Sequence, residues 1–421
     1  MVLLALSGGL DSTMAAYLLR EAGYGVYGLF LFLQEGAKAQ LAKRQVLDAA
    51  TELSLPLTIL DLRRPFARDV MEPFLHAYQK GLTPNPCARC NPLIKFKALN
   101  DYSEAFGFDH IATGHYAEIS YQSDLGEYYV RRPKDASKDQ TYVLAYLRQP
   151  ILKKIIFPLA DYCKTDLRNQ AQALHYHQAD QAESQDICFV PQNLRDFFKT
   201  SYLTNPSGNF VDSQGNILGP HKGLMNYTLG QSRHLGIALG ERVYVTEINP
   251  FTRAITLGKE EDLAQKTIYL RQLSLAGPKT ARTWMAPAPS LANTPLPPAL
   301  LPTPGSTPAP MSVAEPRSTE APVPAFLETQ MMTRYRSQLR PVTLFPHARQ
   351  EGENAPFVSL TKEEKKKVMA DLWAGILPDE NVVFEARAQE AFRAPTPGQL
   401  AVFYQDDLLL GGATICKEYK I

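Results

Sequence analysis

The chain has few cysteines, no long apolar run and almost no net charge. Its 421 residues contain five cysteines, an odd number and too few for a disulfide framework, which predicts a reducing, cytoplasmic setting. No stretch approaches the roughly 20 apolar residues that span a bilayer, so we expect no membrane partner. The 44 basic and 43 acidic residues nearly cancel, so binding of a nucleic acid would depend on local patches.

Strand and helix patterns alternate through the first 200 residues. Apolar strand patterns at 2–6, 25–33, 57–60 and 110–113 alternate with helical patterns at 12–22, 37–53, 63–79 and 95–106. Gly23, Gly81 and Gly107 follow three of these helical patterns as stop signals. This order is typical of a parallel sheet with crossover helices, and we expect an open α/β domain over residues 1–204.

The remainder of the chain has sequence patterns typical of β structure. Short strand patterns at 209–211, 243–248 and 254–258 predict a small β-rich central module over residues 205–262. Further strand patterns at 330–345, 382–388, 400–404 and 408–415 predict a C-terminal antiparallel β-barrel over residues 263–421. A charged helix with a capping signal is expected at 361–373.

A proline-rich stretch interrupts the predicted C-terminal barrel domain. Residues 278–324 hold 13 prolines in 47 residues, mixed with Ala, Ser and Thr. Such a composition cannot build a packed core, so we expect an extended, mobile insertion.

A glycine-serine loop follows the first strand and opens the first helix. The run is Ser7-Gly8-Gly9-Leu10-Asp11-Ser12. Its glycines allow close approach of an anion, and free amides at a helix start hold phosphate oxygens, although a purely structural turn is the alternative. The loop lacks the lysine of a Walker motif, so charge neutralisation is expected from Mg²⁺ with Asp11 as its ligand. Asp11 could also cap the helix, and the two roles can coexist.

The loop resembles that of the pyrophosphate-loop ATP pyrophosphatases, which cleave ATP between the α and β phosphates and activate a substrate oxygen as an adenylate. Further motifs, taken together and in this order, closely resemble the tRNA-specific 2-thiouridylases. They are TPNPCARCN at 83–91, IKFK at 94–97, ATGHY at 112–116, SKDQTY at 137–142, SQDICF at 184–189 and YTLGQ at 227–231. The resemblance resumes with TRYR at 333–336 and TPGQ at 396–399, beyond the proline-rich stretch.

The resemblance implies two sets of binding residues. The ATP set is Ala5, Leu6, Ser7, Gly8, Gly9, Leu10, Asp11, Ser12, Leu31 and Gly114. The tRNA set is Asn85, Pro86 and Cys87 against the target base, with His115, Lys138, Asp139, Gln140, Arg334, Tyr335 and Gln399 on the RNA around it. A basic cluster at 131–138 is either a phosphate contact or a solvated loop.

The resemblance also assigns two cysteines to sulfur transfer. Cys188 would carry a persulfide, and Cys90 would attack the carrier sulfur and leave a disulfide. Considered alone, Cys87 and Cys90 form a zinc half-site without a second pair, and Cys188 resembles a buried inert thiol. Cys87 stands where some relatives carry an acidic residue, and it could instead form a disulfide with Cys90.

The function implied is ATP-dependent 2-thiolation of the wobble uridine of tRNA. Its partners would be the anticodon region of tRNA and a sulfur donor, either a cysteine desulfurase or a relay protein. Two alternatives remain open: another pyrophosphate-loop ligase or amidotransferase, and a tRNA-binding relative that has lost catalysis. The segment at 32–36 is shorter than is usual for the family, which affects the expected donor or tRNA surface.

Overall fold

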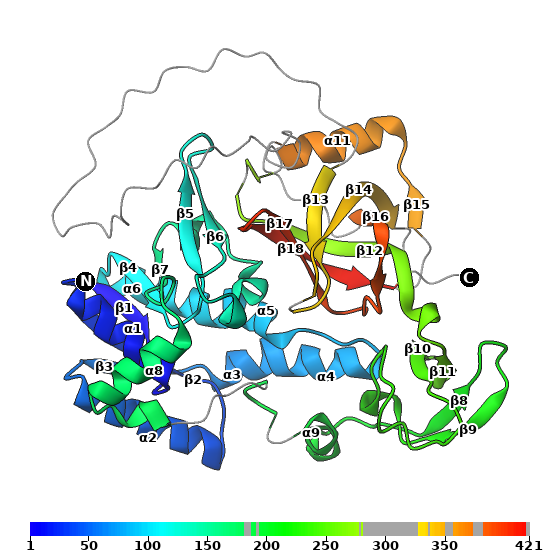
Figure 1. Cartoon of the computed structure of the whole chain (residues 1–421), viewed down its shortest axis with the longest axis horizontal. Helices are drawn as coiled ribbons and strands as arrows, with labels where there is room; N and C mark the ends of the chain where they lie inside the picture. Colours follow the sequence, from blue (N-terminus) through cyan, green and yellow to red (C-terminus); the bar gives the residue numbers. More distant parts are fainter. Residues whose placement is uncertain are drawn as a thin grey trace.

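The computed structural model describes residues 1–180, 187–190, 193–277, 279–280, 327–335, 337–349, 357–373 and 382–417. Nearly all of the proline-rich stretch and the first half of the SQDICF motif therefore lie outside the described residues. Within these ranges no helix is long and apolar enough to cross a membrane. Figure 1 shows three regions: a sheet with helices, a small β module and a barrel.

The N-terminal region is a five-stranded parallel sheet in the order β3-β2-β1-β4-β7. Its strands are β1 (Val2–Ala5), β2 (Val26–Phe32), β3 (Leu57–Asp61), β4 (His110–Thr113) and β7 (Ile155–Ile156). The helices α1 (Leu10–Glu21), α2 (Ala37–Glu52) and α8 (Lys164–Ala173) pack on one apolar cluster, and α6 (Phe96–Phe106) packs on another. The predicted open α/β fold is confirmed.

Two helical segments of this region contain π turns next to a proline. The first joins α3 (Arg63–Phe66), the π turn η1 (Ala67–Met71) and α4 (Glu72–Gln79). The second joins α5 (Pro86–Cys90), the π turn η2 (Asn91–Lys95) and α6. Pro92 has no N–H to donate within the second turn, which favours the wider turn at that point.

The glycine stop signals behave as the sequence predicts. Gly23, Gly81 and Gly107 have φ values of 84°, 68° and 73°. Gly107 follows α6 directly as its left-handed cap. Each glycine therefore ends its helix by adopting the left-handed conformation that other residues avoid.

The central module is a four-stranded sheet in the order β10-β11-β8-β9. Its strands are β8 (Gly208–Val211), β9 (Ile217–His221), β10 (Tyr244–Asn249) and β11 (Ala254–Gly258). The short helices α9 (Leu194–Thr200), η6 (Leu224–Asn226) and η7 (Glu261–Leu263) accompany it. The predicted β-rich module is confirmed, and α4 extends from the first sheet toward it (Figure 1).

The C-terminal region is a six-stranded antiparallel barrel in the order β12-β16-β14-β13-β17-β18, closed by pairing of β12 with β18. Its strands are β12 (Ala264–Leu275), β13 (Leu327–Met332), β14 (Arg340–Arg349), β16 (Val382–Arg393), β17 (Leu400–Gln405) and β18 (Leu408–Cys416), with β15 (Phe357–Ser359) beside β14. The barrel prediction is confirmed, but the predicted strand at 330–345 is two strands joined by a turn, and β12 is not among the predicted strands.

Helix α11 (Lys362–Trp373) confirms the predicted charged helix. The Thr361 N–H donates to Glu364 Oε2 at 2.8 Å, and the Glu364 N–H donates to Thr361 Oγ1 at 3.3 Å. This reciprocal pair is the capping box that the sequence indicates.

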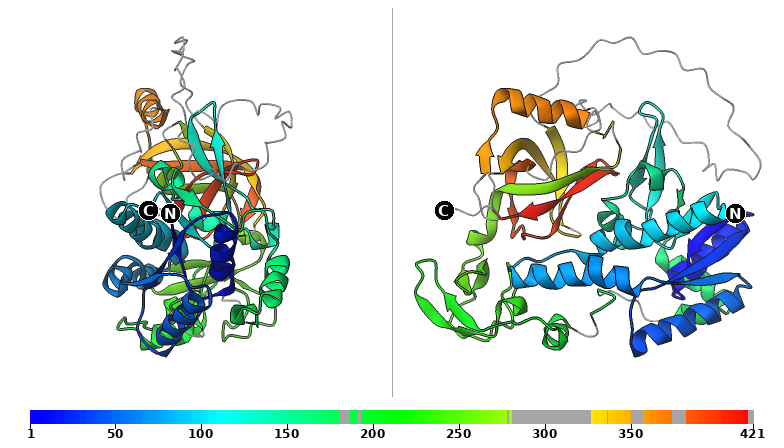
Figure 2. Two further views of the ribbon diagram at one scale, coloured as in Figure 1. Left: turned by 90° about the vertical axis from the view of Figure 1, so that its left-hand side faces the viewer. Right: turned by 180° about the vertical axis from the view of Figure 1, so that it is seen from behind.

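A hairpin from the N-terminal region joins the barrel. Strands β5 (Glu118–Gln122) and β6 (Glu127–Arg131) form it, and β6 pairs with β18. Buried Glu127 accepts from the Tyr129 hydroxyl at 2.8 Å and from the Lys279 N–H at 2.9 Å. The hairpin stands beside the barrel in Figure 2, so the first and last parts of the chain share one sheet.

Short helices complete the N-terminal region. They are η3 (Ala136–Lys138), η4 (Thr141–Leu144), α7 (Gln149–Leu152) and η5 (His177–Asp180). The Tyr142 hydroxyl of η4 donates to the Leu400 carbonyl at 2.5 Å. The hydroxyls of Thr141 and Tyr404 are also hydrogen-bonded to each other at 2.8 Å. These buried bonds fix η4 against the barrel and so hold the N-terminal region to it.

Candidate active site

The loop between β1 and α1 presents backbone N–H groups at the start of a 12-residue helix. The first bond within the helix runs from the Thr13 N–H to the Gly9 carbonyl at 3.1 Å, so residues 10–12 have no N–H acceptor inside the helix. The Ser7 and Ser12 hydroxyls lie 3.0 Å apart, and Ser12 Oγ accepts from the Ser7 N–H at 3.1 Å. With the helix dipole behind them, these groups suit phosphate oxygens.

Two glycines allow other segments to approach this loop. A Cβ atom on Gly8 would lie 2.6 Å from the backbone nitrogen of Val46 in α2. A Cβ atom on Gly114, just after β4, would lie 2.9 Å from the backbone of Asp11 and Ser12. Close packing alone therefore requires glycine at both positions. The ATP contacts assigned to them stay a prediction, as does that of Leu31, which is partly buried in β2.

A lysine from a distant segment meets the loop, and sequence reasoning missed it. Lys164 begins α8, and its Nζ lies 2.9 Å from Asp11 Oδ2. The other oxygen of Asp11 accepts from the Tyr116 hydroxyl at 3.0 Å. The Lys164 side chain is only 12% exposed, so this ion pair is shielded from solvent screening. The loop thus has a cation after all, supplied by tertiary structure.

Three thiols gather near one another. Cys87 and Cys90 lie three residues apart on α5, and Cys188 comes from far along the chain. Cys90 belongs to the same apolar cluster as Phe189, and Ile187 packs against that cluster, so both chain neighbours of Cys188 lie there. Negative charge on either Cys87 or Cys188 also raises the pKa of Cys90. Lys38 of α2 donates from Nζ to the Cys188 carbonyl at 3.5 Å. The structure therefore brings the segment that carries Cys188 to the apolar cluster that contains Cys90.

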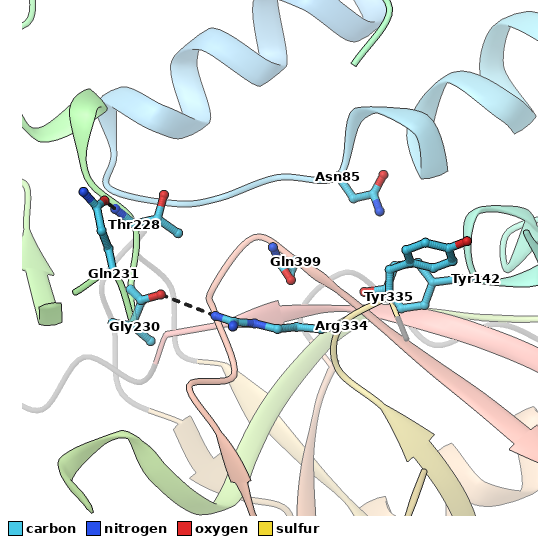
Figure 3. Close-up of a pocket in the computed structure, with 9 residues that line it drawn as sticks. Asn85, Tyr142, Thr228, Gly230, Gln231, Arg334, Tyr335 and Gln399 are labelled. Carbon is cyan, nitrogen blue, oxygen red and sulfur yellow. Dashed lines mark hydrogen bonds between the residues drawn. The ribbon is translucent and has the colours of Figure 1, made fainter. Parts of the chain in front are cut away.

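A pocket of about 490 Å³ lies where the three regions meet (Figure 3). It is lined by Asn85, Tyr142, Thr228, Leu229, Gly230, Gln231, Arg334, Tyr335 and Gln399. Arg334 Nη2 donates to the Leu229 carbonyl at 3.3 Å and to Thr396 Oγ1 at 3.0 Å, which joins the central module to the barrel. Tyr335 is 46% exposed, so its ring can meet a bound partner.

Models of known families match three stretches of the chain. A tRNA methyl transferase HUP domain matches residues 1–192, a tRNA methyl transferase PRC-barrel domain matches 195–259, and an aminomethyltransferase beta-barrel domain matches 349–415. These matches follow the sheet, the central module and the barrel in order.

Curated relatives decide the family. The chain is 33% identical to the tRNA-specific 2-thiouridylase MnmA of Carboxydothermus hydrogenoformans over 99% of its own length and 97% of the relative. The chain belongs to the tRNA-specific 2-thiouridylase family. It is also 37% identical to a 2-thiouridylase of Clostridium botulinum, over 65% of this chain and 78% of that relative.

Solved structures resemble the chain over less than half its length. The U34-tRNA thiolase NcsA from Methanococcus maripaludis matches with a TM-score of 0.31 and 19% identity, covering 44% of this chain and 60% of that one. NMN synthetase from Francisella tularensis matches with a TM-score of 0.27 and 18% identity, covering 44% and 66%. Similarity at this level carries no argument about function.

The tRNA residues that the 2-thiouridylase resemblance implies fall into two groups in the structure. Asn85, Arg334, Tyr335 and Gln399 line the pocket, together with Tyr142 and residues 228–231, which were not assigned from the sequence. The YTLGQ motif was the available signal for the latter. The pocket therefore unites motifs from all three regions of the chain.

The second group has bonds within the protein. Asp139 Oδ1 accepts from the Thr141 N–H at 2.9 Å, and Gln140 Oε1 accepts from the Tyr116 N–H at 2.9 Å. Burial lowers the pKa of His115 to about 3, with the charge of Lys95 adding to the effect, so this imidazole is neutral. These residues shape the site, and their contact with tRNA, like that of Lys138 and Pro86, stays a prediction.

The two arginines of the basic cluster at 131–138 are engaged inside the molecule. Arg131 Nε lies 3.0 Å from Asp407 Oδ2. Arg132 lies over the Tyr404 ring at 4.5 Å and 3.7 Å from an Asp139 oxygen. Both arginines therefore serve the junction of hairpin and barrel, which favours the structural alternative for these two residues.

All five cysteines are free in the structure, so it does not support the disulfide between Cys87 and Cys90. Within the described part of the chain, no group of three His, Cys, Asp or Glu side chains could hold a metal ion by itself. The zinc half-site interpretation of the cysteine pair gains no support.

The thiols of this site are expected to react in an order set by burial. Burial raises the pKa of Cys90 to about 12, and it also raises the pKa of the more exposed Cys87 and Cys188. Because the thiolate is the nucleophile, alkylation by iodoacetamide should accelerate with rising pH, and Cys90 should react last. Peptide mass spectrometry between about pH 7 and pH 10 measures the rates. Equal rates at Cys90 and Cys188 near pH 8 would contradict this.

Proposed function

We propose that this chain uses ATP to replace the C2 oxygen of the wobble uridine of tRNA by sulfur carried on Cys188. The observation that carries the proposal is that the residues flanking Cys188 pack in the apolar cluster of Cys90, in a chain that also has the pyrophosphate loop. Membership of the tRNA-specific 2-thiouridylase family supports the overall reaction and the use of ATP. Methyl transfer, named in two of the family descriptions, would need neither the loop nor two thiols.

In the first step the uridine O2 attacks the α-phosphorus of ATP, and pyrophosphate leaves. The amides of residues 10–12 and the hydroxyls of Ser7 and Ser12 would hold the phosphates. Lys164 would stabilise the negative charge that develops on the leaving pyrophosphate. Mg²⁺ held mainly by ATP phosphates needs one or two carboxylates, and Asp11 fits that pattern; bound there, it would neutralise phosphate charge.

In the second step the terminal persulfide sulfur on Cys188 attacks C2, and the C2–O bond breaks with AMP as the leaving group. The Cys90 thiolate then attacks the Cys188 sulfur, the sulfur–sulfur bond to the base breaks, and 2-thiouridine is released. Cys90 and Cys188 are left as a disulfide, which an external thiol must reduce. A persulfide-bearing protein would reload Cys188, in the cytoplasm where tRNA is modified.

The pocket of Figure 3 is proposed as the entrance for the anticodon nucleotides. Arg334 supplies a positive charge there, and Tyr335 supplies an exposed ring on which a base can stack. A wobble base must leave the anticodon stack to reach the thiols, as in other enzymes that act on a single base. Asn85, which lines the pocket and caps the start of α5, would connect the entrance to the cysteine pair.

Mass spectrometry of nucleosides tests the proposal. Unmodified tRNA is incubated with the protein, ATP, Mg²⁺ and a persulfide donor, and 2-thiouridine is expected at the wobble position. ATP cleavage without thiouridine would favour another ligase of the loop superfamily. Tight tRNA binding without pyrophosphate release would favour an inactive relative.

A further inference from the structure

One lysine influences every thiol of the candidate site. The ammonium of Lys95 lowers the pKa of Cys87, Cys90 and Cys188, and thus opposes the effect of burial on each. Lys38 of α2 acts in the same direction on Cys188. Neither the ATP loop nor the tRNA pocket uses Lys95, and the sequence gives it no role beyond its place in the IKFK motif.

The π turn η2 brings Lys95 nearer to the face of the helix that carries Cys90. Lys95 follows Cys90 by five residues, and in a regular α-helix it would point about 140° away. In η2 the Phe96 N–H bonds to the Asn91 carbonyl, five residues back, so each turn takes more residues than in an α-helix and the offset between Cys90 and Lys95 is much smaller than about 140°. The turn therefore rotates Lys95 toward the face of α5 that carries Cys87 and Cys90.

Neighbouring contacts hold this turn in place. Asn91 is buried, and its Nδ2 donates to the Val143 carbonyl at 2.9 Å. Ile94 and Phe96, on either side of Lys95, are both buried. Lys95 itself is only partly exposed, whereas Lys97, two residues later in α6, has a 63% exposed side chain paired with Asp101. Lys95 is thus fixed within the site and Lys97 lies on the surface.

We propose that Lys95 is the electrostatic partner of the sulfur-transfer step: its ammonium keeps the terminal persulfide sulfur of Cys188 anionic and stabilises the attacking Cys90 thiolate. This rests on the proposed function for the identity of the reaction. Each sulfur releases its proton to solvent before it attacks, and the positive charge of Lys95 is retained throughout. Lys95 supplies charge where burial would otherwise hold the thiols protonated.

The charged and titratable groups around the thiols come from three other elements. Lys95 comes from η2 and Lys38 from α2, and the neutral imidazole of His115, which follows β4, is influenced by Lys95. Within the described ranges these are the groups whose influence must be separated from that of Lys95. Lys38 is the important comparison, because its contact is with the Cys188 carbonyl and not with α5.

The test compares Lys95→Met with Lys38→Met and with the surface control Lys97→Met in the full-length protein. For each variant the iodoacetamide rates of Cys90 and Cys188 are measured against pH. Lys95→Met is expected to move both profiles up by about one pH unit, so that both thiols react about tenfold more slowly below their pKa. Lys38→Met should move mainly the Cys188 profile, and Lys97→Met neither.

Activity then links the charge to the reaction. Lys95→Met should release pyrophosphate with tRNA and ATP but form thiouridine about tenfold more slowly, and Lys95→Arg should recover most of the rate. Unchanged alkylation profiles in Lys95→Met would overturn the proposal. It would also be overturned if Lys97→Met slowed the alkylation of Cys90 and Cys188 as much as Lys95→Met does. The alkylation profiles do not depend on tRNA, so they decide on Lys95 even if the wild type forms no thiouridine.

Discussion

Replacement of Cys188 by serine is expected to abolish thiouridine formation while ATP is still cleaved in the presence of tRNA. A serine oxygen cannot carry a persulfide, so no sulfur reaches the activated uridine. Adenylation uses the loop of α1 and should proceed, releasing pyrophosphate and leaving adenylated tRNA to hydrolyse. The fall in thiouridine should exceed about 10³-fold, as for removal of other catalytic nucleophiles. Nucleoside mass spectrometry and a pyrophosphate assay measure the two products.

Cys416→Ser is the matched control for this result. Cys416 ends β18 in the barrel and matches no family motif, so its replacement should leave both products at wild-type levels. Thiouridine formation by the Cys188→Ser variant at the wild-type rate would exclude Cys188 as carrier. Loss of pyrophosphate release in the same variant would show that Cys188 supports the ATP site instead.

Replacement of Lys164 by methionine is expected to impair ATP activation about 10²- to 10³-fold, because it removes a cation that pairs with Asp11 of the loop. Methionine keeps much of the side chain's length, but it leaves the partly buried Asp11 carboxylate without its ion-pair partner. The rate of pyrophosphate release with saturating tRNA should fall. Alkylation of Cys90 and Cys188 should not change, since the role expected for Lys164 is at Asp11 of the loop.

Lys199→Met provides the comparison. Lys199 is 75% exposed and pairs with Asp196 on the surface of α9, so its loss should leave pyrophosphate release intact. An unchanged rate in Lys164→Met would show that the pair with Asp11 is only structural. A fall that is repaired by raising the ATP concentration would assign Lys164 to ATP binding rather than to the bond-breaking step.

Local patterns predict the fold well because the signals are short-range. The glycine stops, the capping box at Thr361 and the loop after β1 each depend on a few neighbouring residues, and each appears in the structure. The strand between 264 and 275 was missed although it closes the barrel through β18. Pairing of β6 with β18 was missed too, since no local pattern encodes a contact between residues 131 and 408.

In the site, too, residues defined by the local sequence could be predicted, and residues brought in by tertiary packing could not. Ser7 to Ser12 could be assigned to phosphate because strand, loop and helix follow one another directly. The partner of Asp11 could not, because Lys164 lies far along the chain and reaches the loop only through the packing of α8 on α1. The place of Lys95 depends on a π turn, and helical periodicity alone would put this side chain on another face.

Oxygen-isotope transfer tests the central claim most directly. A tRNA that carries ¹⁸O at O2 of the wobble uridine is thiolated in a single turnover, and the mass of the released AMP is measured by mass spectrometry. If the uridine oxygen is adenylated and then displaced by sulfur, AMP must carry the ¹⁸O, one label for each thiouridine formed. AMP without the label, or ADP as the product, would contradict adenylation of the base and with it the mechanism proposed for this chain.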